Sequence, residues 1–156
     1  MITRQCAKSV IVISFKETIQ MRVAFISFCP SKNERSIKLI KALGASSISR
    51  GNQVDLFNGF EDLVNTRLTM YDYISVVIEP KGFFGGKIFP RVGEFLAMSG
   101  NITGKKGCAL VIKSGFSSEK TCRNLMRKIE SEGVKLDYFE VIRDEEHARS
   151  AGTKIG

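Results

Sequence analysis

The chain has 156 residues, of which 43% are hydrophobic and 26% charged, values that are ordinary for one globular domain. The net charge is +8, but the 24 basic residues are scattered, which indicates a basic surface suited to phosphates or acidic proteins and disfavours nucleic-acid binding. No run reaches the roughly 18 apolar residues of a membrane helix, so we expect no membrane contact.

The four cysteines are Cys6, Cys29, Cys108 and Cys122, and they show neither metal-ligand spacing nor a Cys-x-x-Cys pair. We therefore expect reduced thiols and a cytoplasmic location. His147 is the only histidine, which leaves a zinc site or a Ser/His/Asp triad with little support.

A regular pattern begins near Met21. We therefore divide the chain into an N-terminal extension, residues 1–20, and one domain, residues 21–156. In chain order, the pattern of this domain predicts a buried strand, a helix, a short alternating strand and one or two helical turns. Two further strand–helix pairs, a last strand and a short helix follow. These segments are 23–28, 33–50, 53–57, 61–70, 73–78, 90–100, 107–112, 117–133, 136–142 and 145–155.

Several residues mark the ends of these helices. Gly51 and Gly133 supply left-handed stops, and Pro90 suits a first helical turn. Ser117 or Ser118 is expected to cap the helix that follows by accepting a hydrogen bond from an orphan amide.

The alternation predicts an α/β fold, with a doubly wound, five-stranded parallel sheet in the order 2-1-3-4-5. Ligands bind such sheets at the carboxyl ends of the strands, where the order reverses, which here is between the first and third strands. Three loops are expected to converge there: 29–35, 79–90 and 114–118.

The first loop leads from a buried strand into a helix, whose N-terminal amides attract anions. Its candidate ligand-binding residues are Cys29, Ser31, Lys32, Asn33 and Glu34. Hydroxyl and amide donors stand beside basic charge in this loop, so we predict an oxyanion or phosphate cradle. The alternative is an ordinary capped turn with basic residues at the surface.

The second loop supplies Pro80, Gly82, Phe83, Phe84 and Gly85 as candidates. The glycines allow a ligand to approach the backbone closely, and the two rings are suited to stacking on a flat ligand. The alternative is that both rings fold into a small satellite core.

The third loop supplies Ser114, Gly115, Phe116 and Ser117. Its glycine and hydroxyls suit the polar edge of a ring, and a plain helix cap is the alternative.

These loops and the order of elements resemble the flavodoxin-like family, which includes flavodoxins and small FMN reductases. The resemblance spans residues 22–155. Residues 27–37 resemble the family's phosphate loop, 80–96 resemble its Pro-x-Tyr-x-Gly loop and Phe-Leu helix, and 104–133 resemble its Gly-Lys-Lys strand, glycine loop and helix.

The resemblance implies that residues 31–34 bind the FMN phosphate, that Phe83 or Phe84 lies beside the flavin ring, and that residues 115–117 line its far edge. The implied function is that of an FMN-binding electron carrier or small oxidoreductase, with a flavin or another phosphate-bearing small molecule as ligand and an acidic redox protein as partner. Lys32 and Glu34 stand where the family usually has glycine and threonine, so a flavin-less binding module of the same fold remains an alternative.

A second resemblance concerns Cys29, followed after five residues by Arg35 and Ser36, which is similar to the signature of low-molecular-weight tyrosine phosphatases. In this alternative Cys29, with a depressed pKa, is the nucleophile and Arg35 grips the phosphate. The glycine of that signature and its Asp-Pro pair are absent from the sequence.

Overall fold

The computed structural model describes residues 20–30, 32–62, 66–80 and 85–156. The strands are β1 (Arg22–Phe28), β2 (Gln53–Asn58), β3 (Tyr73–Ile78), β4 (Lys106–Ile112) and β5 (Lys135–Ile142). The helices are α1 (Glu34–Ser49), α2 (Pro90–Met98), α3 (Ser118–Ser131) and α4 (Glu145–Gly152), with one 3-10 turn, η1 (Leu68–Met70). Apart from Gln20, the predicted extension lies outside the described residues.

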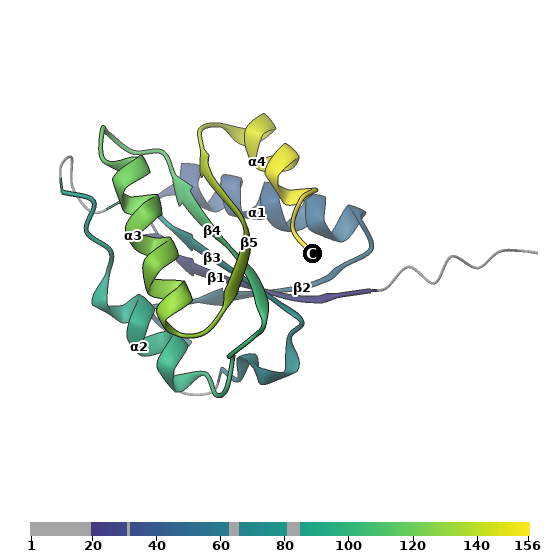
Figure 1. The fold of residues 1–156 in the computed structure, drawn as a ribbon. Helices are drawn as coiled ribbons and strands as arrows, with labels where there is room; N and C mark the ends of the chain where they lie inside the picture. Colours follow the sequence, from purple (N-terminus) through teal and green to yellow (C-terminus); the bar gives the residue numbers. More distant parts are fainter. Residues whose placement is uncertain (1–19, 31, 63–65, 81–84) are drawn as a thin grey trace, which may run out of the picture.

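All neighbouring strands pair in parallel, in the order β2-β1-β3-β4-β5. This confirms the predicted α/β class and the doubly wound order. Helices α1 and α4 cover one face of the sheet, and α2 and α3 cover the other (Figure 1). Among the described residues, no helix has both the length and the apolar character needed to cross a membrane.

The central strands are apolar on both faces because both faces are covered. In β1, Val23 and Phe25 pack into the core beneath α1 and α4, while Ala24 and Ile26 pack into the core beneath α2 and α3. Alternate side chains thus build two separate cores, one on each face of the sheet.

One helical segment agrees with the sequence prediction and one helix end differs from it. The one or two helical turns expected over 61–70 are present, in the described part, as the single turn η1. Helix α4 ends at Gly152 rather than at 155, because the chain there lies against α1: a Cβ on Gly152 would stand 2.4 Å from the carbonyl oxygen of Leu43. The next residues then turn so that the carbonyl of Ile155 accepts from Nδ2 of Asn52 at 2.9 Å.

The fold opens a crevice between β1 and β3. These strands are neighbours, but β1 leads into α1 on one face and β3 leads toward α2 on the opposite face (Figure 1). The segments that follow them therefore separate, which leaves the carboxyl ends of the two strands accessible to a ligand.

Candidate functional site

A hollow of about 700 Å³ lies at this crevice. Its size is within the range of small-molecule sites, roughly 300–1,000 Å³. It is lined by Pro30, Lys32, Asn33, Glu34, Arg35, Glu79, Pro80 and Phe89. The first two predicted loops therefore do meet here, as far as their described residues show.

Asn33 is the N-cap of α1. Its side-chain Oδ1 accepts hydrogen bonds from the backbone N–H groups of Arg35, at 3.2 Å, and Ser36, at 3.4 Å. The sequence prediction required free amides at this turn to hold an anion. For these two amides that prediction is wrong, because the cap residue already satisfies them.

Glu79, the first residue after β3, places its carboxylate against the same turn. Nδ2 of Asn33 donates to both carboxylate oxygens, at 2.8 and 3.0 Å, and Oγ of Ser36 donates to Oε2 at 2.8 Å. A negative group is favoured there by the helix dipole. The turn predicted to cradle a ligand's phosphate thus holds a carboxylate of the chain itself.

Arg35 lines the hollow, but its guanidinium is engaged elsewhere. It donates to the carbonyl of Lys113 at 3.3 Å and to that of Arg143 at 2.8 Å, two residues that directly follow β4 and β5. Among the described residues, the lining carries two basic residues and two acidic ones, Glu34 and Glu79. As far as these residues show, the hollow lacks the net positive charge that the loop sequence suggested.

Cys29 is buried, with 6% of its surface exposed. Burial is the main cause that raises the pKa of its thiol to about 12; the charge of Glu79 adds to the rise, and a hydrogen bond with Ser27 opposes it. This is the opposite of the depressed pKa that the phosphatase alternative requires. The guanidinium of Arg35 is also directed to the ends of β4 and β5. The structure therefore does not bring Cys29, the proposed nucleophile, and Arg35, the proposed phosphate-binding residue, together.

Four of the predicted ligand residues, Ser31, Gly82, Phe83 and Phe84, lie outside the described residues. Of the others in the second loop, Pro80 is buried and lines the hollow, and Gly85 is exposed with φ +112°. The neighbouring Gly86 is fixed to α3, because Nδ2 of Asn124 donates to its carbonyl at 2.7 Å.

Phe89 forms an aromatic wall of the hollow that the sequence analysis did not select. Its ring meets Phe60 edge to face at 5.2 Å, and Phe60 meets Phe28 in the same manner at 5.7 Å. These contacts anchor Phe89 to the core. The available signal was its position next to Pro90, where the second loop ends.

The third loop is closed by Ser118, whose Oγ accepts from the N–H of Ser114 and donates to its carbonyl, each at 3.1 Å. Ser117 is the N-cap of α3, as predicted, but the predicted cap bond is wrong, because its side chain makes no cap hydrogen bond and Ser118 bonds to the loop instead. Oγ of Ser117 is buried and has no hydrogen-bond partner in the part of the chain that the structure describes. Gly115 has φ +63°, and Phe116 is 86% exposed.

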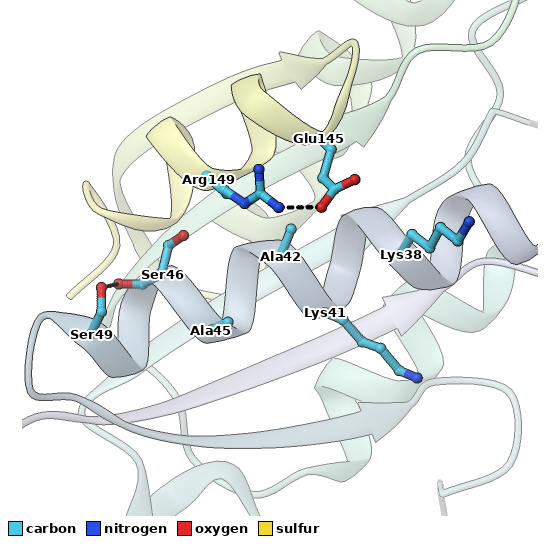
Figure 2. A pocket seen from close by; sticks show the side chains of 8 residues that line it. All are labelled: Lys38, Lys41, Ala42, Ala45, Ser46, Ser49, Glu145 and Arg149. Carbon is cyan, nitrogen blue, oxygen red and sulfur yellow. Dashed lines mark hydrogen bonds and ion pairs between the residues drawn. The ribbon is translucent and has the colours of Figure 1, made fainter.

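A second hollow, of about 560 Å³, lies between α1 and α4, away from the crevice. It is lined by Lys38, Lys41, Ala42, Ala45, Ser46, Ser49, Glu145 and Arg149. Figure 2 shows Glu145 and Arg149 of α4 paired with each other beside α1, while Lys41 points away from α4. Three basic groups against one acidic group make this groove basic.

Comparison with known proteins shows the fold. Oxidised flavodoxin 1 from Bacillus cereus superposes with a TM-score of 0.65 at 14% identity, covering 85% of this chain and 95% of the flavodoxin. A flavodoxin from Fusobacterium nucleatum bound to flavin mononucleotide gives 0.59 at 11% identity, covering 86% and 94%. An NAD(P)H:quinone oxidoreductase from Methanothermobacter marburgensis gives 0.59 at 11% identity, covering 86% and 98%.

The chain therefore has the flavodoxin-like fold over nearly its whole described length. No protein-family model matches the sequence, and no curated protein matches it. At these identities the likeness establishes the architecture, and the site has to be argued from the residues of this chain.

Proposed function

We propose that this protein binds a flavin at the carboxyl ends of β1 and β3 and acts in electron transfer, as a carrier or a small oxidoreductase. The observation that carries the proposal is the hollow at the switch point, which has the size of a small-molecule site and an apolar wall formed by Pro80 and Phe89. The FMN-bound flavodoxin among the similar structures supports the same choice of ligand.

The third loop lines a separate hollow at the same end of the sheet, and it carries two groups that are suited to a ligand. Oγ of Ser117 is a buried hydroxyl without a hydrogen-bond partner among the described residues, and such a group is stabilised when a ligand or water supplies one. Phe116 is an exposed ring on the same loop. A bound flavin supplies the redox chemistry, and the residues of the chain hold and orient it.

The fit at the phosphate end is poor. The cap bonds of Asn33 occupy two first-turn amides, and Glu79 sets a carboxylate beside them. This arrangement does not suit the phosphate of FMN, the cofactor implied by the sequence resemblance. It also favours a second candidate function, that of a binding module of this fold that takes no flavin.

The partner in this proposal is an acidic redox protein in the cytoplasm. The groove between α1 and α4 carries Lys38, Lys41 and Arg149 against Glu145, which gives it the complementary charge. A complex formed there is expected to weaken as salt increases.

The test is a titration of the full chain with riboflavin and with FMN, followed by quenching of flavin fluorescence. Saturable binding of either flavin with one-to-one stoichiometry supports the proposal. Phe89→Leu is expected to weaken binding several-fold because it removes a ring from the wall, while Phe139→Leu, on the exposed edge of β5, is the matched control. If neither flavin is bound, the flavin-less module is the function that remains.

A further inference from the structure

We infer that Glu79 is a specificity-determining residue that excludes a terminal phosphate, so that the flavin taken by this site is one whose ribityl chain ends in a hydroxyl, as in riboflavin. The inference rests on the proposed function and deepens it. It starts from the disagreement between the fold, whose solved examples include an FMN-bound protein, and the charge that this chain places at the first turn of α1.

The side-chain donors of Asn33 and Ser36 and two first-turn amides are already in use. Oδ1 of Asn33 accepts from the backbone of the turn, and its Nδ2 donates to the carboxylate of Glu79. The hydroxyl of Ser36 donates to the same carboxylate. A phosphate could take these donors only by displacing Glu79. The displaced carboxylate, which is half-buried, would then lose three hydrogen bonds.

A phosphate that left Glu79 in place would lie beside a like charge. Repulsion between two such groups at contact distance is strong where the surroundings are partly shielded from water. The described cations of the hollow offset it little: the guanidinium of Arg35 is directed to two carbonyls at the ends of β4 and β5, and the described lining carries as many acidic as basic residues.

A hydroxyl end group meets none of these penalties. It is uncharged and compact, and it can donate to a Glu79 oxygen, since each carboxylate oxygen has more than one acceptor position. The same arrangement that repels a phosphate therefore accepts an alcohol. The apolar wall formed by Pro80 and Phe89 carries no charge, so it does not distinguish between the two end groups.

The experiment compares riboflavin with FMN on three proteins at one ionic strength: the natural chain, Glu79→Gln and Glu130→Gln. The Glu79→Gln variant keeps an acceptor for Asn33 and Ser36 and removes the charge, and Glu130 is an exposed residue of α3 that controls for net charge. For the natural chain we expect riboflavin to bind at least about tenfold more tightly than FMN. Glu79→Gln is expected to raise FMN affinity by about tenfold and change riboflavin affinity less than about twofold, and Glu130→Gln to change neither.

A second measurement uses the natural chain alone. Inorganic phosphate in excess is expected not to displace riboflavin, and displacement would overturn the inference. An FMN-to-riboflavin ratio that Glu79→Gln leaves unchanged would overturn it too, while flavin binding, and with it the proposed function, would stand. Failure of both flavins to bind would overturn the proposed function and this inference together.

Discussion

The hydroxyl of Ser36 and the carboxylate of Glu79 meet at 2.8 Å, although 43 residues separate them in the sequence. The contact joins the first turn of α1 to the end of β3 across the crevice between two neighbouring strands. Together with Asn33 it forms a network that satisfies the helix start from within the chain. If the site binds the flavin that we propose, the same network acts on both the stability of the fold and the choice of ligand.

The first prediction concerns Asn33. Asn33→Ala removes the acceptor for two first-turn amides and a donor to Glu79, so we expect the free energy of unfolding to fall by about 2 kcal/mol. Urea unfolding followed by circular dichroism measures the change. In a Glu79→Gln background the loss should be smaller, because the bond to a charged group is weaker when that group is neutral. Equal losses in the two backgrounds would show that the network is not coupled.

A second prediction tests the role of Arg35 as a structural tie between α1 and the ends of β4 and β5. Arg35→Ala is expected to lower the free energy of unfolding by about 1 kcal/mol, because its two bonds to carbonyls are lost at a largely exposed position. Arg35→Lys should not restore it, since one ammonium does not reproduce the planar fork that reaches two carbonyls.

The matched control for this position is Lys38→Ala, which removes an exposed basic residue from the next turn of α1 and should stay within about 0.5 kcal/mol of the natural chain. If Arg35→Ala left the free energy of unfolding unchanged and instead weakened the binding of inorganic phosphate, the role of Arg35 would be to bind an anion rather than to link α1 to the sheet.

Much of the fold is predictable from local pattern. The apolar runs of β1, β3 and β4 indicate strands covered on both faces, and the strand predicted over residues 73–78 coincides with β3. Cys108 stands in an apolar run and Cys122 on an apolar helix face, and both are buried in the core. The structure of region 61–70 is harder to predict. The side chain of Asp62 accepts a hydrogen bond from the backbone N–H of Asn58 at 2.6 Å, and such a local bond competes with a helix.

The location of the site could be predicted from the sequence, but the hydrogen bonds within it could not. The order of strands and helices located the crevice, and Asn33 was expected at its edge. The role of Glu79 depends on which strand lies beside β1 and on the side-chain rotamers that let it reach Asn33 and Ser36. Periodicity carries no such information. The signal that was available is a carboxylate directly after a buried strand, at the end of the sheet where ligands bind.

The last prediction concerns the thiol of Cys29, whose pKa burial raises from its ordinary value of 9.0 to about 12. The folded thiol therefore stays protonated where the unfolded one ionises. This contribution to stability is complete below about pH 9 and is lost as the pH rises toward 12, since the unfolded state then binds fewer protons. Urea midpoints from about pH 8 to about pH 10 should fall less steeply for Cys29→Ala than for the natural chain.

The same burial makes Cys29 a poor nucleophile. Alkylation by iodoacetamide, quantified for each cysteine by mass spectrometry, is expected to be slower at Cys29 by about a hundredfold or more in the folded protein than in urea, because both access and thiolate are lacking. Unfolding the chain exposes the thiol and returns its pKa toward the ordinary value, so the rate in urea supplies the internal reference. Rapid modification of Cys29 in the folded state, together with hydrolysis of an aryl phosphate that Cys29→Ser abolishes, would contradict this assignment and restore the phosphatase alternative.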